Sequence, residues 1–176
     1  DLYDVTKVDV FTMHDRPRRF CLEIFSGTSR IAAALQKEHI TAFPIDIDLF
    51  PSHNVLDPKI AETICHWISS RRVRLIWLGM PCTTFSRARR NDGVGPLPLR
   101  DSLNIWGISG LRPHDVRKLH EGNKLFLFTM RILRLCEDLS IPYVLENPLT
   151  SMAWEMPPLL KFRETYQPSF CDLDFC

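Results

Sequence analysis

The chain has 176 residues, of which 45% are apolar and 24% charged, and this composition excludes a disordered, collagen-like or coiled-coil protein. Its 22 Lys and Arg residues are nearly balanced by 21 Asp and Glu residues, for a formal charge of +1. That balance excludes the uniformly cationic surface of a histone-like nucleic-acid binder. The length predicts one domain over residues 1–176, with residues 1–18 as an N-terminal extension.

The sequence contains no run of about 18 apolar residues, so we expect no membrane partner. Residues 1–20 lack the apolar core of a signal peptide. A domain of this size does not need disulfide bonds, and the cysteines form no C-x-x-C pair, so we expect reduced thiols, an intracellular protein and no metal site. The six cysteines are Cys21, Cys65, Cys82, Cys136, Cys171 and Cys176.

Apolar segments typical of strands alternate with segments typical of helices along the chain. Because such an alternation favours a parallel sheet, we expect an α/β fold with helices on both faces and with ligands at the carboxyl ends of the strands. The predicted strands are residues 19–26, 41–47, 73–78 and 141–145, and the predicted helices are residues 30–38, 58–69 and 125–139.

Two segments lie outside this alternation. Residues 91–120 are dense in Gly, Pro, Asn, Asp and Ser without a clean period, which predicts a long loop with short helical pieces beside an active site. Residues 164–176 are predicted to add one further strand.

The first strand ends in a glycine turn, Phe25-Ser26-Gly27-Thr28-Ser29. Free backbone N–H groups at the start of the helix that follows suit a carboxylate, a phosphate or a methionine moiety. A single glycine is also common in ordinary turns, so a purely structural role stays open.

Three aspartates follow the second strand. Asp46 lies about 20 residues beyond the glycine turn, where a carboxylate can accept both hydroxyls of a ribose. Asp48 could share that role, and a helix cap or a solvent-facing acid is the alternative for either residue. Asp57 could reach an adenine amino group, although a helix N-cap before Pro58 is the stronger interpretation.

The third strand runs out through Gly79, Met80 and Pro81 to Cys82. A thiol that leaves a buried strand in this way is exposed at the ligand-binding edge of the sheet, and positive surroundings would favour its nucleophilic thiolate form. Between Thr63 and Asn91 there are six arginines and no acid, which could also hold phosphates. A solvated basic loop is the alternative. The arginines are Arg71, Arg72, Arg74, Arg87, Arg89 and Arg90.

The fourth strand ends at Glu146, followed by Asn147 and Pro148. An acid at the end of so apolar a strand is suited to donate a proton to a ring nitrogen. A buried acid that only makes structural hydrogen bonds is the alternative.

Taken together, these four strand ends resemble the cytosine-5 DNA methyltransferases over residues 22–148. The run from Phe25 to Gly27 is similar to the family's Phe-x-Gly turn, and Asp46 to its acidic ribose ligand. Pro81-Cys82-Thr83-Thr84-Phe85-Ser86 is similar to the family's P-C-x-x-F-S nucleophile loop at every fixed position, and Glu146-Asn147 to its E-N pair.

The resemblance implies a Rossmann-like fold that binds S-adenosylmethionine and methylates carbon 5 of cytosine in DNA. Cys82 would add to carbon 6 of a base flipped out of the helix, while Glu146 and Asn147 complete the catalytic set. The nucleic-acid contacts would come from Ser86, Arg87, Arg89 and Arg90. The cofactor contacts would come from Phe25, Ser26, Gly27, Thr28, Ser29, Asp46, Ile47, Asp57, Gly79 and Pro81.

The chain also departs from the family pattern. The Q-x-R-x-R strand that helps to hold the base has no counterpart, and the target-recognition lobe of complete enzymes would follow Cys176. We therefore expect a further domain or subunit to supply target recognition. The expected location is the nucleus in a eukaryote and the cytoplasm in a bacterium or phage. Two alternatives stay open, namely a tRNA methyltransferase and an inert module that binds cofactor or nucleic acid without turnover.

Overall fold

The computed structural model describes residues 4, 7–14, 17–89 and 96–172. Contacts group the chain into two compact units, which we describe separately. The sheet unit comprises Asp1–Met80 and Leu127–Glu146, and the loop unit comprises Pro81–Phe126 and Asn147–Cys176. The organisation as one domain stays a prediction.

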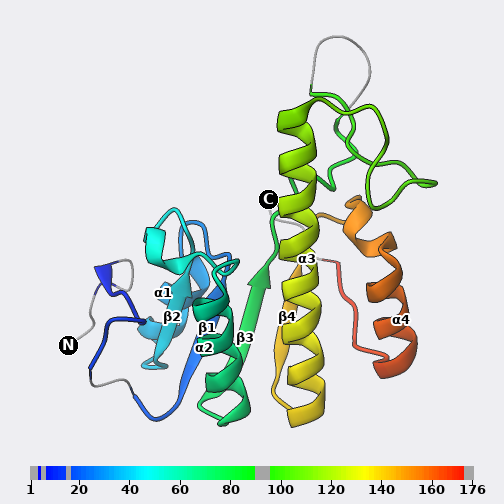
Figure 1. Ribbon diagram of the computed structural model, residues 1–176. Helices are drawn as coiled ribbons and strands as arrows, with labels where there is room; N and C mark the ends of the chain where they lie inside the picture. The colour runs from blue at the N-terminus through cyan, green and yellow to red at the C-terminus, as the bar shows by residue number, and fades with distance from the viewer. Residues whose placement is uncertain (1–3, 5–6, 15–16, 90–95, 173–176) are drawn as a thin grey trace. The chain divides into compact units, whose positions relative to one another are not determined.

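The sheet unit contains four strands that all run parallel, in the order β2-β1-β3-β4 (Figure 1). The α/β class and the four strands with their interleaved helices are confirmed, and a parallel sheet of this kind is compatible with a Rossmann-like fold. The strands are β1 (Phe20–Ile24), β2 (Ala42–Ile45), β3 (Val73–Gly79) and β4 (Tyr143–Glu146).

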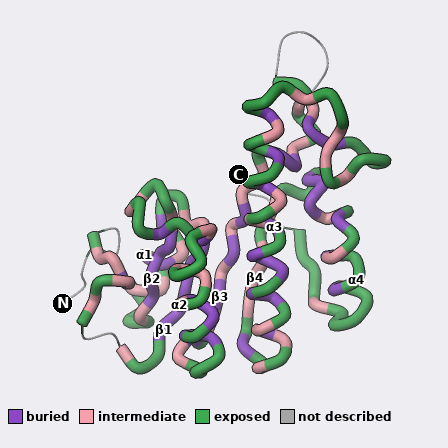
Figure 2. The backbone as a smooth tube through the Cα atoms, viewed as in Figure 1, coloured by how far each residue is buried: buried purple, intermediate pink, exposed green. Residues whose placement is uncertain are grey.

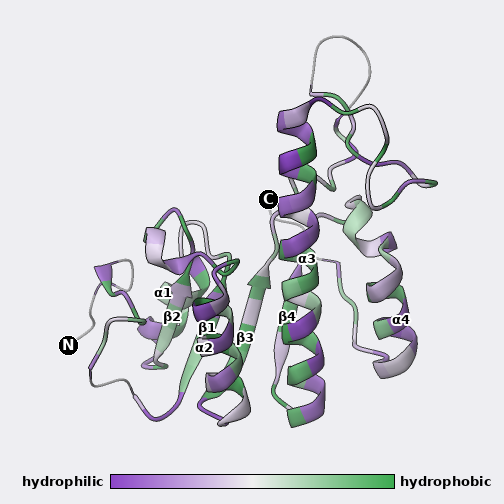
Figure 3. Cartoon of the chain, viewed as in Figure 1, coloured by the Kyte–Doolittle hydropathy of each residue, from purple (hydrophilic) through white to green (hydrophobic). Residues whose placement is uncertain are grey.

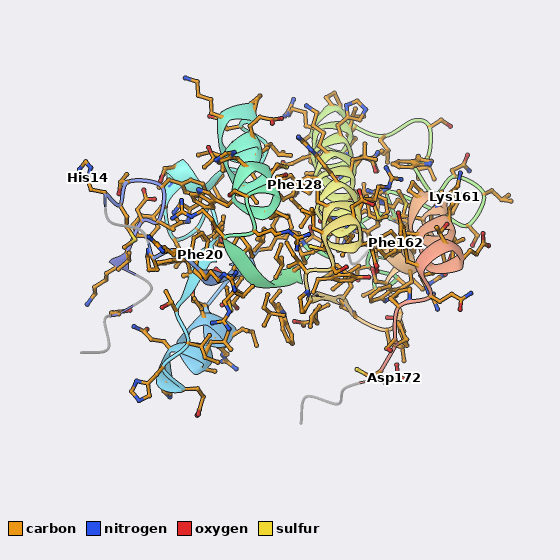
Figure 4. The ribbon with its side chains drawn as sticks, turned by 90° about the horizontal axis from the view of Figure 1, so that it is seen from below. His14, Phe20, Phe128, Lys161, Phe162 and Asp172 are labelled. Carbon is orange, nitrogen blue, oxygen red and sulfur yellow. The ribbon has the colours of Figure 1, made fainter. Side chains whose placement is uncertain are left out.

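Helices of the sheet unit cover both faces of the sheet, and every residue of the inner strand β1 is accordingly buried, four of them apolar and the fifth Glu23. In Figure 4, helix α1 (Arg30–Lys37) lies below the sheet, and helix α2 (Pro58–Ser69) lies above it with the second half of α3 (Pro113–Leu139). Ala32 of α1 packs with Cys21 and Ala42 on one face. On the other face, the Trp67 ring of α2 meets the Phe20 ring with centroids 5.5 Å apart.

The loop unit contains the first half of α3, a 3-10 helix η3 (Met152–Glu155) and helix α4 (Pro157–Tyr166). Its buried side chains are largely aromatic and sulfur-containing, whereas much of the chain between β3 and α3 is exposed (Figure 2). The main buried members are Phe85, Leu99, Leu119, Phe126, Met152, Met156, Leu159 and Phe162.

Helix α3 begins at Pro113, so the last eight residues of the predicted loop 91–120 belong to one long helix, where the sequence predicted only short helical pieces. Proline suits the first turn of a helix because its missing N–H needs no partner there. The first turns of α3 are mainly hydrophilic (Figure 3) and bury only a few side chains, among them Leu119. For this reason the sequence of these turns shows no apolar period.

The predicted strand over residues 164–176 is also wrong within the described residues. Helix α4 continues to Tyr166, and residues 167–172 form no strand. Leu159 and Phe162 supply the buried face of α4 at helical spacing. No helix in the described ranges has the length and apolar character needed to cross a membrane.

Candidate functional site

The turn between β1 and α1 has an unusual backbone. Phe25, Gly27 and Ser29 all have positive φ angles of 61°, 50° and 58°. Glycine adopts this conformation at no steric cost, but a phenylalanine and a serine are strained in it. Such strain persists only where the surrounding structure imposes it and is concentrated at functional sites.

The structure brings this turn together with Asp46. Oδ2 of Asp46 accepts the backbone N–H of Gly27 at 2.8 Å, and Oδ1 accepts the N–H of Asp48 at 2.9 Å. An ionised carboxylate has about four acceptor positions, so each oxygen keeps capacity for a further donor. Ile47 is 55% exposed and Asp48 is also exposed.

The expectation of free N–H groups at the start of α1 is wrong for two of them. Glu23 of β1 is buried, and its carboxylate accepts the N–H groups of Ile31 at 3.3 Å and Ala32 at 2.7 Å. An acid can occupy this apolar strand because the start of a helix offers donors and positive potential. In the sequence, the presence of an acid inside an otherwise apolar strand was the feature that marked Glu23 as unusual.

Burial raises the pKa of Glu23, although the two backbone N–H groups act in the opposite direction. The carboxylates of Asp46 and Glu146 raise it further through repulsion. Two acids that follow or end β2 and β4, Asp46 and Glu146, therefore lie near enough to Glu23 to act on its pKa.

Asp57 has the capping role that was the stronger interpretation of its sequence. Its Oδ1 accepts the N–H of Lys59 at 2.8 Å, and Pro58 occupies the first turn of α2. Capping of this kind stabilises a helix by about 1 kcal/mol. A contact between Asp57 and adenine stays a prediction.

Asp9 and His53 form a hydrogen-bonded pair that supports the backbone of Asp46, and the sequence did not predict it. Nδ1 of the buried His53 accepts the N–H of Asp46 at 3.4 Å, and its Nε2 lies 3.1 Å from Oδ1 of Asp9. Burial lowers the pKa of His53, which favours the neutral ring, with its proton on Nε2. No local pattern signals this pair, because 44 residues separate the two side chains.

Asp9 also accepts hydrogen bonds from the Ser52 hydroxyl and from the N–H of Phe11. Burial alone would raise the pKa of Asp9, but these two hydrogen bonds and His53 together lower it. Asp9 of the N-terminal extension is therefore hydrogen-bonded to the residues that support Asp46.

The ends of β3 and β4 bring Gly79 and Glu146 into register as neighbours. Nε1 of Trp77 donates a hydrogen bond to Oε2 of Glu146 at 3.2 Å, which restrains the exposed carboxylate. A Cβ atom on Gly79 would lie only 3.0 Å from the backbone oxygen of Phe25. Glycine at this position therefore permits β3 and the glycine turn to approach closely.

In the loop unit, Cys82 opens a tight turn. The N–H of Phe85 donates to the carbonyl oxygen of Cys82 at 2.8 Å, and both Pro81 and Cys82 are half-buried. Phe85 itself is 1% exposed, and its carbonyl oxygen accepts the N–H of Met152 at 2.9 Å. The Cys82 turn (residues 82–85) therefore joins an accessible thiol to a buried anchor.

Arg100 holds this turn and was not identified from the sequence. It is 3% exposed and donates hydrogen bonds to the carbonyl oxygen and the hydroxyl of Thr84, both at 3.0 Å. Its guanidinium also lies over the Phe85 ring, 3.9 Å from the centroid. Burial lowers the pKa of Arg100 to about 10, so the side chain remains charged at neutral pH.

Gly122 and Asn123 of α3 complete this support. The side-chain oxygen of Asn123 accepts from Arg100 at 2.7 Å. A Cβ atom on Gly122 would lie 2.4 Å from the hydroxyl oxygen of Thr84, so only glycine lets the helix pass this close to the Cys82 turn. The sequence carried a signal here, since Gly-Asn within a helical segment is unfavourable unless packing requires it.

The arginines of the expected basic patch are largely engaged by the protein. Arg87 forms an ion pair with Glu155, and Arg89 donates to the carbonyl oxygens of Thr83 at 2.8 Å and Leu97 at 2.9 Å. Ser86 accepts the N–H of Ala88. Contacts of Ser86, Arg87 and Arg89 with nucleic acid stay predictions, and Arg90 lies outside the described residues.

The arginines before β3 belong to the sheet unit. Arg71 donates to the carbonyl oxygen of Leu139 at 3.1 Å, and Arg72 donates to that of Pro17 at 3.0 Å. Arg74 is exposed. The five described arginines of the predicted patch are thus divided between the two units, three in the sheet unit and two in the loop unit.

The candidate catalytic residues also divide between the units. Glu146 belongs to the sheet unit, whereas Cys82 and the half-buried Asn147 belong to the loop unit. Five free cysteines are described, of which Cys21, Cys65 and Cys136 are buried and Cys171 is exposed. Within the described ranges, no three His, Cys, Asp or Glu side chains gather as a metal site.

Comparison of the chain with protein-family models, curated proteins and solved structures found no match.

Proposed function

We propose that the protein transfers a methyl group from S-adenosylmethionine to carbon 5 of cytosine in DNA, with Cys82 as the nucleophile. The register of β3 and β4 is the observation that carries this proposal. Gly79 is the neighbour of Glu146, and Cys82 follows Gly79 by three residues along the chain. This connectivity supports a shared role for the thiol and the carboxyl group at the carboxyl edge of the sheet.

The residues after β1 and β2 fit the proposed cofactor. Asp46 retains acceptor capacity for two ribose hydroxyls, and Gly27 has open space where a Cβ atom would stand. The close approach of Gly79 to the backbone of Phe25 keeps side-chain bulk out of the same edge. When bound, S-adenosylmethionine supplies an electrophilic methyl group.

Cys82 would form a bond from Sγ to carbon 6 of cytosine, and electron density would move to carbon 5. Carbon 5 would take the methyl group and then lose its proton, and the returning electron pair would break the bond between Sγ and carbon 6. The sulfonium–methyl bond would break as the new bond to carbon 5 forms, so the donor would leave as S-adenosylhomocysteine. The proton from carbon 5 would pass to water, and the balanced products are 5-methylcytosine, S-adenosylhomocysteine, a proton and the regenerated Cys82 thiolate.

Glu146 would hydrogen-bond the ring nitrogen and the amino group of the base while the ring accepts electron density. Its contact with Trp77 restrains one carboxylate oxygen, so the other is available to the base. Because the thiol must approach the face of the ring, a duplex substrate has to flip its cytosine out of the stack.

An oligonucleotide that contains 5-fluorocytosine tests this function. After methyl transfer the fluorine on carbon 5 cannot leave as a proton does, so the bond to Cys82 persists and the adduct survives denaturing electrophoresis. We expect an adduct with wild-type protein in the presence of S-adenosylmethionine and none with Cys82→Ser.

Cys171→Ser is the matched control, because Cys171 is an exposed thiol in the same unit. This variant should trap the oligonucleotide like the wild-type protein. An adduct with RNA and not with DNA would reassign the substrate. Failure of the wild-type protein to trap either polymer would refute the methyltransferase proposal and favour an inert binding module.

A further inference from the structure

We propose that His53 is a positioning residue for cofactor binding, which holds Asp46 where its carboxylate can accept the hydroxyls of the ribose, and that Asp9 holds His53 in turn. This inference rests on the function proposed above, because it concerns the ribose site of S-adenosylmethionine. His53 is 1% exposed. Its ring is screened from solvent, so it can affect the cofactor only through the residues that it holds.

The chain from Asp46 to His53 folds back on itself, and we call residues 46–53 the Asp46 loop. At the start of this loop, the carbonyl oxygen of Asp46 accepts the N–H groups of Leu49 at 3.1 Å and Phe50 at 3.2 Å. At its end, the N–H of His53 donates to the carbonyl oxygen of Phe50 at 2.8 Å. Nδ1 of the His53 ring then accepts the N–H of Asp46 at 3.4 Å. The ring therefore closes the loop onto the residue that carries the proposed ribose acceptor.

The backbone position of Asp46 determines where its carboxylate lies. The two carboxylate oxygens accept the N–H groups of Gly27 at 2.8 Å and Asp48 at 2.9 Å. A backbone displacement of about 1 Å would distort both hydrogen bonds and misplace the acceptor positions that remain for the ribose. Because His53 holds the one backbone donor of Asp46, it is suited to fix this position.

Asp9 determines the orientation of the His53 ring. Nε2 of His53 lies 3.1 Å from Oδ1 of Asp9, and the Ser52 hydroxyl donates to Oδ2 of Asp9 at 2.8 Å. A carboxylate only accepts hydrogen bonds, so this contact places the ring proton on Nε2 and leaves Nδ1 as an acceptor for Asp46. The neutral ring in this tautomer satisfies both of its partners at once.

The surroundings of the ring oppose its protonation. The rings of Phe11 and Phe50 pack on His53 with centroids 5.2 Å and 4.8 Å away. Burial lowers the pKa of His53 below the ordinary 6.5, although Asp9 and Asp46 act in the opposite direction. These two carboxylates are the charged groups of the described residues that act on the ring. In acid, a proton on Nδ1 would face the N–H of Asp46 as a second donor, and the contact would be lost.

Isothermal titration calorimetry with S-adenosylmethionine at about pH 7.5 tests the role of the ring. His53→Leu keeps an apolar side chain without a donor or acceptor, and we expect it to bind about tenfold more weakly than wild-type protein. His53→Gln should stay within about threefold of wild type, because its amide supplies both an acceptor and a donor. His66→Gln is the matched control, since His66 is exposed on α2, and it should bind like wild type.

A double-mutant cycle tests whether His53 acts through Asp46. In an Asp46→Ala background the ribose acceptor is already absent, so His53→Leu should cause little further loss of affinity. Equal losses in the two backgrounds would show that the ring affects binding by another route, and the proposal would be wrong.

Asp9→Ala tests the outer member of the pair. It should weaken binding in the same direction by about threefold. Asp4→Ala is its control, because Asp4 pairs with Lys7 at the surface of the same N-terminal segment, and it should leave the affinity unchanged. The same affinity for wild-type protein and Asp9→Ala would remove Asp9 from the proposal.

The pH dependence separates a hydrogen-bonding ring from one that only fills space. From about pH 7.5 to about pH 5, the affinity of wild-type protein should fall about fivefold more than that of His53→Gln, because glutamine does not titrate. Protonation of Asp46 itself occurs in both proteins and cancels in the comparison. The same pH dependence in both proteins would contradict the acceptor role of Nδ1.

Circular dichroism and urea unfolding verify that each variant is folded. If His53→Leu does not fold, Asp9→Ala and the pH comparison with His53→Gln decide the outcome. If wild-type protein binds S-adenosylmethionine and His53→Leu binds it equally well, the positioning role is overturned and the proposed function is left intact. If wild-type protein binds no S-adenosylmethionine, the proposed function fails and the role of His53 fails with it.

Discussion

The carboxylate of Asp46 binds the backbone N–H of Gly27 at 2.8 Å, although 19 residues separate them. This hydrogen bond joins the end of β2 to the strained turn after β1. It makes Asp46 both a structural part of the turn and the proposed acceptor for the ribose of the cofactor.

We expect Asp46→Ala to weaken binding of S-adenosylmethionine by more than about tenfold, because it removes charged acceptors that contribute about 2 kcal/mol. Asp48→Ala is the control, since Asp48 contributes its backbone N–H to Asp46 and its side chain is exposed. Isothermal titration calorimetry measures both affinities, and circular dichroism verifies that both variants are folded. Equal losses in the two variants would contradict the ribose assignment.

Gly122→Ala tests the close approach of α3 to the Cys82 turn. Alanine favours a helix over glycine by about 1 kcal/mol, but the new Cβ atom would stand 2.4 Å from the buried hydroxyl of Thr84. Overpacking of this kind costs about 1–3 kcal/mol, so we expect a net loss of stability in urea unfolding. In a Thr84→Ala background the same substitution should be nearly neutral or stabilising, and an equal loss in both backgrounds would count against the packing argument.

Glu23 should make stability depend on pH in an unusual direction for an acid. Its pKa in the folded protein is raised above the ordinary 4.5 by burial, so the folded state retains a proton that the unfolded chain releases. The resulting stabilisation is complete below the ordinary pKa and is lost as the pH rises through the raised value. The effect reverses the usual behaviour of a carboxylate with a lowered pKa.

The measurement is urea unfolding of wild-type protein and Glu23→Gln across about pH 4 to pH 7. Relative to the variant, the free energy of unfolding of the wild-type protein should fall as the pH rises. Glutamine loses one of the two acceptor oxygens, but that difference does not depend on pH. The contributions of Asp9 and His53 occur in both proteins and cancel in the comparison. A constant difference across the range would show that the pKa of Glu23 is not raised.

The cysteines should separate into two classes under native alkylation by iodoacetamide. Burial raises the pKa of Cys136 to about 12 and also raises the pKa values of Cys21 and Cys65. These three thiols are both protonated and covered, whereas Cys82 and Cys171 are accessible. Peptide mass spectrometry should find label on the accessible pair in native protein and on all five only after unfolding. Native labelling of Cys136 would contradict the buried core.

Local patterns in the sequence were sufficient to predict the four strands, the glycine turn and the helices that interleave the strands. Each of these features depends on residues close together in the chain, as in the apolar run of β3 or the Asp57-Pro58 start of α2. The same locality explains two wrong predictions. Residues 113–120 were predicted as loop because the first turns of α3 bury few side chains and therefore show no apolar period. The end of α4 was predicted as part of a strand because the helix starts at two prolines and shows no strong apolar period along its length.

The partners of the site residues were decided by the tertiary structure. The acid inside the apolar run of β1 marked Glu23 as unusual, but no local pattern identified the start of α1 as its partner. Nor did the sequence indicate that Asp9 would meet His53 or that Arg100 would hold Thr84. A buried polar group must find a hydrogen-bond partner, and the available partners are those that packing brings to the same place. The sequence by itself therefore determined which chemical groups leave the carboxyl ends of the strands, and the fold determined what holds them there.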